Sequence, residues 1–259
     1  MFRPIKIFLT SFPMAIIFWK IACKILGIKI PGKEKWQSFF LGKSGIEIGG
    51  PSALFKSKGY LPLYPLVQSL DGVNFSNATV WEGKLSEGLH YKYEDKTGYQ
   101  YIAEGSSLPV IGDAAYDFVL SCNNLEHIAN PIGALLEWKR IIKKNGAVLL
   151  VLPNKFANFD HNRPYTSIAH LVDDFKNNRD ENDLTHLEEV LKLHDLKRDP
   201  QAGDYQNFRE RCADNYLNRC IHHHVFNQDL LQQLCSYCDM EVTLQFSNKT
   251  DHFILAVKK

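Results

Sequence analysis

The sequence predicts an α/β fold in which helices cover both faces of a doubly wound, mostly parallel sheet of seven strands. From Ser44 onward, short apolar runs alternate with amphipathic stretches, which is typical of parallel strands joined by helices. The first apolar run ends in a glycine-rich turn, as at the ligand-binding edge of such sheets. Two β-rich runs near the C-terminus, separated by a short polar turn, indicate a hairpin.

Five strands are predicted before the hairpin, each a short apolar run between turn residues, at residues 45–48, 66–70, 99–103, 117–121 and 147–152. A helix is expected between the fourth and fifth strands, because Pro131 suits a first helical turn and Asn145-Gly146 suits an end. The hairpin strands, 241–246 and 252–257, complete the seven, and a helix over about 227–237 precedes them.

The chain is divided by its patterning into residues 1–43, a basic apolar helical segment, and residues 44–259, one α/β domain. Residues 156–226 do not follow the strand-helix alternation, so they are interpreted as an insertion before the hairpin. Helices are expected in the insertion near residues 167–177, 184–194 and 205–219.

The N-terminal segment is the one strongly basic part of the chain, since six Lys and Arg side chains precede Glu34. Its apolar run over residues 7–23 is interrupted by Pro13 and Lys20, which favours an interfacial helix on a membrane surface or a helix packed on the domain over a true span. We therefore expect a cytoplasmic protein with membrane contact, if any, through residues 1–33. Six scattered cysteines agree with a reducing compartment, and a net charge of +1 gives no reason to expect nucleic acid as a partner.

Three acidic positions lie at or just after the ends of the first three predicted strands, in order. Glu47 precedes the Gly49-Gly50 turn, where glycine lets backbone pass close to a ligand. The turn lacks the third glycine of a dinucleotide fingerprint, and Pro51 removes an amide donor. Asp71 follows the second apolar run, where an acid can accept ribose hydroxyls or simply form a turn, with Glu82 as the alternative carboxylate. Glu104 follows the third.

This order, continued by Tyr116-Asp-Phe-Val-Leu, Leu125-Glu-His127 and Asn130-Pro131, resembles the class I S-adenosylmethionine-dependent methyltransferases over about residues 45–154. The corner Lys144-Asn145-Gly146-Ala147 departs from the family's Lys-Pro-Gly-Gly. The histidine-rich C-terminal extension also resembles that of a bacterial group of these enzymes.

The resemblance implies S-adenosylmethionine as cofactor and assigns its contacts. The residues implied are Glu47, Gly49 and Gly50 around the methionine part, Asp71 at the ribose, Glu104, Gly105 and Ser106 at the adenine, and Asn123 along the cofactor. His127 is placed where it can reach the methyl acceptor, although a histidine at the start of a helix is the simpler interpretation.

The insertion holds the expected acceptor contacts. The loop from Asp160 to Pro164 follows the fifth strand, so His161 is a candidate base and Arg163 a candidate partner for a carboxylate or phosphate, unless the loop is held by its own hydrogen bonds. Further candidate contacts are Asp160, His186, His222 and His224. A polar pocket is favoured over a metal site for these histidines, and no metal ligand is assigned, because their spacings match no standard zinc pattern.

The sequence therefore predicts a methyltransferase acting on a small-molecule, glycan or lipid-linked acceptor. A non-catalytic binding module with the same fold remains the alternative, because the Gly-Gly-Pro turn is altered. A nicotinamide-dependent oxidoreductase is a third interpretation, which the missing third glycine opposes. Methyl transfer needs a base only for a protonated nucleophile, so a catalytic residue is not required by the reaction itself.

Overall fold

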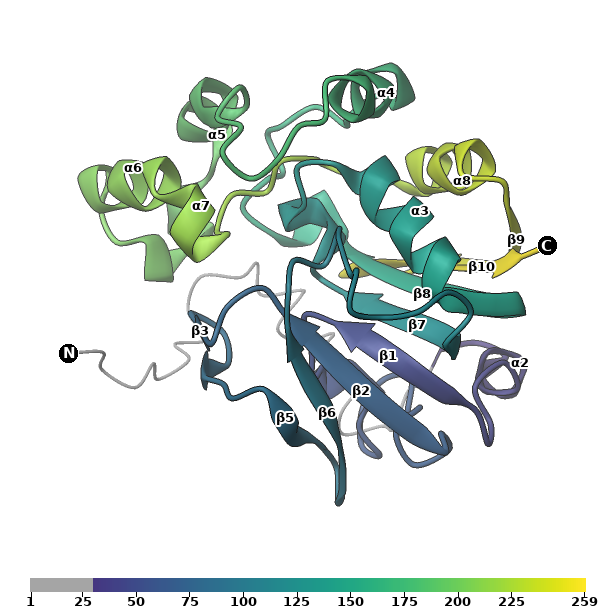
Figure 1. Cartoon of the computed structure of the whole chain (residues 1–259). Coiled ribbons are helices and arrows are strands. Elements are labelled where there is room, and N and C mark those ends of the chain that lie inside the picture. Colours follow the sequence, from purple (N-terminus) through teal and green to yellow (C-terminus); the bar gives the residue numbers. More distant parts are fainter. Residues whose placement is uncertain (1–29) are drawn as a thin grey trace.

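The computed structural model describes residues 30–259 (Figure 1). The apolar run over residues 7–23 lies outside the described residues. Of residues 1–33, for which membrane contact is expected, only residues 30–33 are described. Within the described part, no helix combines the length and the hydrophobicity needed to cross a membrane.

The core of the structure is an eight-stranded sheet in the order β5-β6-β2-β1-β7-β8-β10-β9. Strands β6, β2, β1, β7 and β8 run parallel, and β5, β10 and β9 join antiparallel. The bounds are β1 Ser44–Ile48, β2 Ser69–Asn74, β5 Gly88–Tyr93, β6 Lys96–Ile102, β7 Tyr116–Cys122, β8 Ile142–Pro153, β9 Met240–Ser247 and β10 Asp251–Lys258. A separate hairpin joins β3 (Ala78–Thr79) to β4 (Gly83–Lys84).

The predicted fold class is confirmed, with two differences in the sheet. The sheet has eight strands rather than seven, because β5 pairs with the edge of β6. The second strand begins at Ser69, not at Leu66, because the apolar residues before it belong to a loop that fills the core beneath the sheet. Leu63, Tyr64 and Val67 are fully buried there.

Strand alternation divides the core into two layers. In β8, Val148, Leu150 and Leu152 face one layer, and the residues between them face the other. The first layer packs under α3 (Pro131–Ile141), α4 (Ile168–Lys176) and α8 (Gln228–Tyr237). The second is covered by α2 (Lys33–Gln37) and loops, where Trp36 contacts Phe253 edge to face.

The expected insertion contains α4, α5 (Leu187–Leu193), α6 (Tyr205–Ala213) and α7 (Asn215–Asn218). The helix expected over residues 205–219 is broken at Asp214, which separates α6 from α7. Helices α5, α6 and α7 gather beyond the arrowhead of β1 (Figure 1). They have a small core of their own, formed by Val190, Ala202, Phe208, Cys212 and Ile221. An extended segment, residues 219–227, returns the chain from α7 to α8.

Candidate active site

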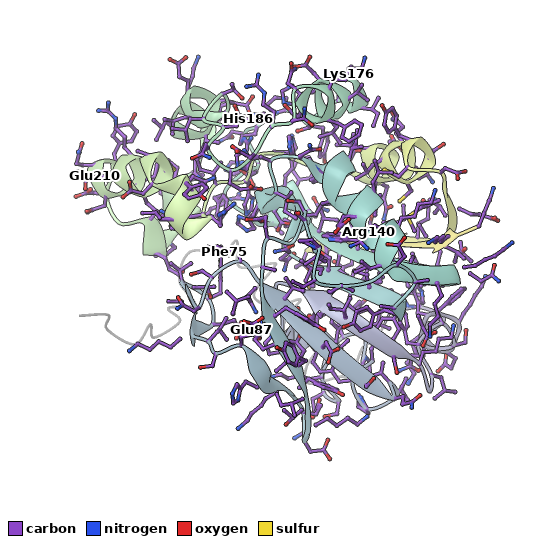
Figure 2. All side chains as sticks on the ribbon, viewed as in Figure 1. Phe75, Glu87, Arg140, Lys176, His186 and Glu210 are labelled. Carbon is purple, nitrogen blue, oxygen red and sulfur yellow. The ribbon has the colours of Figure 1, made fainter. Side chains whose placement is uncertain are left out.

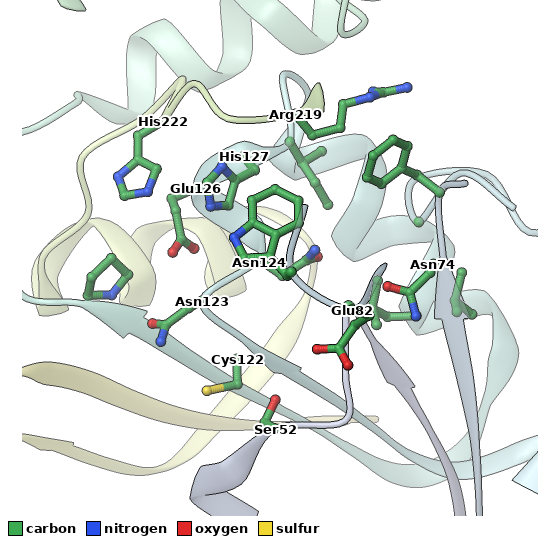
Figure 3. Close-up of a pocket in the computed structure, with 18 of the residues that line it drawn as sticks. Ser52, Asn74, Glu82, Cys122, Asn123, Asn124, Glu126, His127, Arg219 and His222 are labelled. Atoms are coloured by element: carbon green, nitrogen blue, oxygen red, sulfur yellow. The ribbon is translucent and has the colours of Figure 1, made fainter. Parts of the chain in front are cut away.

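A cavity of about 730 Å³ lies at the carboxyl ends of the parallel strands (Figure 3). Gly49, Asn74, Gly105, Asn123 and Pro153 line it from the ends of β1, β2, β6, β7 and β8. The insertion closes another side with Phe159, Glu181, Arg219 and His222. This volume and position are typical of a small-molecule site in an open α/β sheet.

The turn after β1 requires glycine at position 49. Gly49 has φ of +80°, and its amide donates to the carbonyl of Val73. A Cβ atom here would lie 2.5 Å from Asn124 Nδ2. The turn thus lets the backbone at the end of β1 approach Asn124, and both residues line the cavity.

Glu47 does not face the cavity, because alternation along β1 turns its side chain to the opposite layer from Ile46 and Ile48. Its carboxylate is fully buried and accepts from Tyr64 Oη at 2.6 Å, Tyr91 Oη at 2.7 Å and the amide of Ser52 at 3.1 Å. Burial raises the pKa of Glu47. Glu47 therefore anchors the turn from behind. Gly50 does not line the cavity, and a Cβ on it would meet Glu47 Cδ at 2.3 Å.

Asp71 also lies away from the cavity, because β2 continues for three residues beyond it. Its Oδ1 accepts from the amide of Tyr99 at 2.7 Å, and its Oδ2 accepts from Tyr116 Oη at 2.7 Å. At the true end of β2 the cavity is lined by Asn74, whose Nδ2 donates to the carbonyl of Gly50 at 3.2 Å. Glu82, the alternative carboxylate, lines the cavity from the β3–β4 hairpin.

Glu104 and Gly105 line the cavity after β6, whereas Ser106 does not. Glu104 Oε2 lies 2.9 Å from Arg219 Nη2, and Arg219 also reaches Glu181 Oε2 at 3.0 Å. Burial and the neighbouring Glu181 raise the pKa of Glu104. The Arg219 guanidinium lies 5.0 Å from the centre of the Phe75 ring. The insertion thus places a cation on the carboxylate that follows β6.

His127 lines the cavity (Figure 3). Its ring centre lies 5.2 Å from that of Trp81, which also lines the cavity. Its Nδ1 lies 3.1 Å from the carbonyl oxygen of Ile221. Since a carbonyl only accepts hydrogen bonds, Nδ1 carries the proton and Nε2 is the acceptor nitrogen. Burial holds the pKa of His127 well below 6.5, so the ring is neutral at pH 7.

His222 and Glu126 complete this side of the cavity. His222 packs edge to face on His127, and its Nδ1 is hydrogen-bonded to Asp160 Oδ2. Although burial opposes protonation, the Asp160 carboxylate raises the pKa of His222. Burial raises the pKa of Glu126 to about 7. The cavity therefore holds a neutral imidazole beside a charge-stabilised one.

Comparison with protein families gives a match over residues 70–150 to a model described as "Methyltransferase domain". Residues 70–150, about a third of the chain, thus resemble a methyltransferase domain. The cofactor of the domain is S-adenosylmethionine. A search among curated proteins finds no match.

The chain is also similar to solved structures of methyltransferases. One is a SAM-dependent methyltransferase from Methanosarcina mazei, with 18% identity, a TM-score of 0.47, and coverage of 89% of this chain and 99% of that one. Another is a SAM-dependent methyltransferase from Aquifex aeolicus, with 12% identity, a TM-score of 0.46, and coverage of 88% and 90%.

Asp160 and Arg163 lie buried within the protein rather than at the cavity surface. The Arg163 side chain is 1% exposed, and it pairs with Asp160 at 3.0 Å and with Glu189 at 2.8 Å. It also donates to the carbonyls of His222 and His223. All guanidinium nitrogens are thereby engaged, so Arg163 cross-links the insertion, and Asp160 orients His222.

The structure places the remaining predicted histidines outside the methyltransferase cavity. His161 Nε2 lies 2.9 Å from Asp195 Oδ2, and neither residue lines the cavity. His186 and His224 lie together beside α4. Cavity residues that the sequence interpretation did not select are Asn74, Trp81, Asn124, Glu126, Phe159, Glu181 and Arg219. Only Asn74 and Asn124 had a local signal, since each follows a buried strand.

Proposed function

We propose that the chain transfers a methyl group from S-adenosylmethionine to a small-molecule, glycan or lipid-linked acceptor bound in the same cavity. The observation that carries this proposal is the position of His127. Its ring lines the cavity together with Gly49 and Glu104, and its Nδ1 is committed to the carbonyl of Ile221. Nε2 is thus free to accept a proton from an acceptor hydroxyl or amine.

The cavity residues fit the cofactor. The close backbone approach at Gly49, with Asn123 and Asn124 beside it, suits the methionine end. Asn74 and Glu82 offer oxygen acceptors for ribose hydroxyls, in place of Asp71, and Glu104 offers one for the adenine amino group. When bound, S-adenosylmethionine supplies a methyl group already activated on a sulfonium. The chain then contributes mainly orientation.

We assign acceptor recognition to the insertion. Phe159, Arg219 and His222 reach the cavity from it, while the strand ends of the core line the opposite side. This arrangement supports one domain over residues 44–259 that includes an acceptor-selecting insertion over residues 156–226. Because Asp160 and Arg163 are buried and paired, they hold the acceptor wall in place and do not touch the acceptor.

Calorimetric titration with S-adenosylmethionine and S-adenosylhomocysteine tests the cofactor part. We expect both to bind, Glu104→Ala to weaken binding by roughly tenfold, and Asp71→Asn to leave the Kd within about twofold. Methyl transfer is then followed with a labelled methyl group offered to fractionated polar and lipid extracts. A folded chain that binds neither compound would refute the proposal.

One observation favours the alternative of a non-catalytic module. The carboxylate of Glu104 is already paired with Arg219, so adenine must share or displace that cation. If the chain binds the cofactor and every extract fraction stays unlabelled, binding without turnover is the better description. A labelled product excludes it.

We further propose a cytoplasmic location with membrane contact through residues 1–33, on the basis of their basic and apolar composition. Co-sedimentation with anionic vesicles measures this directly. Removal of residues 1–33 should abolish sedimentation, and unchanged sedimentation would contradict the assignment.

A further inference from the structure

Four polar side chains converge beside α4, outside the cofactor cavity. His170 and Asp174 lie one turn apart on α4, His186 precedes α5, and His224 lies in the extended segment 219–227. One ligand-type atom from each lies within 4.8 Å of all the others. His186 is labelled in Figure 2, between α4 and α5. Three separate segments of the insertion thus meet at one point.

Three of the six distances between these atoms are close to those around a tetrahedral ion. His170 Nε2 lies 3.1 Å from His186 Nε2 and 3.3 Å from Asp174 Oδ2, and His224 Nε2 lies 3.7 Å from Asp174 Oδ2. Zinc bonds of about 2.0–2.2 Å in a tetrahedron separate neighbouring ligand atoms by roughly 3.3–3.6 Å. Three nitrogens and one carboxylate oxygen are also a donor set that zinc accepts.

Hydrogen bonding alone leaves this cluster incomplete. Asp174 is 2% exposed, and its Oδ2 has no hydrogen-bond partner among residues 30–259. The nitrogen nearest to it, His170 Nε2, also faces His186 Nε2, and a neutral ring nitrogen cannot donate fully to both. A buried oxygen without a donor is costly. A cation bound by all four groups removes both conflicts.

Two neighbouring clusters of side chains are less suitable as metal sites. Asp183, near His186 and His223, already accepts from Arg179 and Thr185. The set Glu126, His127 and His222 belongs to the cofactor cavity, and both its histidines have Nδ1 engaged.

We propose that His170, Asp174, His186 and His224 bind one zinc ion. Four protein ligands make a closed, structural site. His224 Nε2 also lies 3.2 Å from the carbonyl of Ala129, a contact that zinc binding replaces. The site ties α4 and the start of α5 to segment 219–227, from which Arg219 and His222 reach the cavity. The ion therefore fixes one wall of that cavity without touching its contents.

The metal content of the full chain, purified without chelator, tests the proposal independently of any methyl transfer. We expect about one zinc ion per chain by mass spectrometry. Loss of an outer-shell partner typically weakens a metal site by about 10–100-fold, so Asp174→Asn and His186→Gln should each weaken zinc binding by at least about tenfold. His161→Gln is the matched control and should keep the ion, because His161 pairs with Asp195 away from the four proposed ligands.

Two further readouts cover variants that fail to fold. Zinc added to the metal-stripped parent should raise its Tm, and cobalt in the same site should give the strong visible absorption of tetrahedral coordination. The proposal would be overturned by a metal-free chain whose Tm does not change when zinc is added, by a weak octahedral cobalt spectrum, or by loss of zinc on His161→Gln.

Discussion

Arg219 Nη2 lies 2.9 Å from Glu104 Oε2, so a residue of the insertion neutralises a carboxylate of the core. The Arg219 side chain is 10% exposed, and its Nη1 lies 3.0 Å from Glu181 Oε2. Removing one partner of such a pair leaves a buried charge uncompensated. This contact couples the position of the insertion to the side of the cavity that follows β6.

A double-mutant cycle measures that coupling. Arg219→Met and Glu104→Gln should each lower the free energy of unfolding, and together they should cost at least about 1 kcal/mol less than their sum. Urea denaturation provides the values. The surface pair Lys139 and Asp239, changed to Met and Asn, should show much weaker coupling, because the Asp239 carboxylate is 80% exposed. Equal coupling energies in the two pairs would contradict the prediction that burial strengthens the ion pair between Arg219 and Glu104.

The turn after β1 gives a second prediction. Gly49→Ala combines left-handed backbone strain with a clash against Asn124 Nδ2, so it should abolish cofactor binding and lower stability by more than about 2 kcal/mol. Gly42 also has positive φ but nothing within 4 Å of its missing Cβ. Gly42→Ala should therefore cost only about 1–2 kcal/mol and leave binding intact. Thermal unfolding and calorimetry separate the two, and equal effects would refute the assignment of the clash.

The buried carboxylate of Glu47 should contribute to the free energy of unfolding rather than to cofactor binding. Glu47→Gln replaces an acceptor of three or more hydrogen bonds with a group that also donates, which should lower the free energy of unfolding by about 1–3 kcal/mol. Glu241→Gln changes a carboxylate that is 64% exposed and should have almost no effect. If Glu47→Gln keeps full stability but loses cofactor affinity, Glu47 contacts the cofactor after all.

The lowered pKa of His127 leads to a prediction for the pH profile of the reaction. Because burial lowers its pKa, the ring loses its proton below pH 6.5 and is a neutral base at every higher pH. The acid limb of kcat/KM that belongs to His127 should therefore lie below pH 6.5. Nuclear magnetic resonance of the ring gives its midpoint without an acceptor.

For an acceptor that must lose a proton, His127→Asn should lower kcat by about 10²–10⁴-fold and remove that limb. A ring midpoint above pH 6.5, or an unchanged kcat with such an acceptor, would exclude His127 as the base.

Local patterning predicted most of the core. The runs at Ile46, Phe118 and Leu149 are short, apolar and bounded by turns, so the strands could be placed from sequence. The second strand was misplaced, because the loop before it is as apolar as a strand and its burial depends on tertiary packing. Strand β5 had a signal in the alternation of Leu89, Tyr91 and Tyr93, which the interpretation passed over.

The site was harder to predict. The direction in which a side chain points and the residue that it pairs with depend on the whole fold, not on the local sequence. Gly49, Glu104, Gly105, Asn123, His127 and His222 reach the cavity as expected. Glu47 does not, because its side chain lies on the opposite face of β1. Asp71 does not, because β2 continues for three residues beyond it. The pairing of Arg219 with Glu104 joins residues 115 positions apart, which no motif spacing reveals.

The position of β10 between β8 and β9 has a consequence for biosynthesis. β10 pairs with β8 through Asp251 and Pro153, which are 98 residues apart in the chain. At about 5–20 residues per second, the ribosome needs roughly 5–20 s to make the intervening polypeptide. For that interval the apolar edge of β8 has no strand to cover it, and an uncovered edge is where nascent chains associate. The growing protein should thus be a client of ribosome-associated chaperones during the synthesis of its insertion.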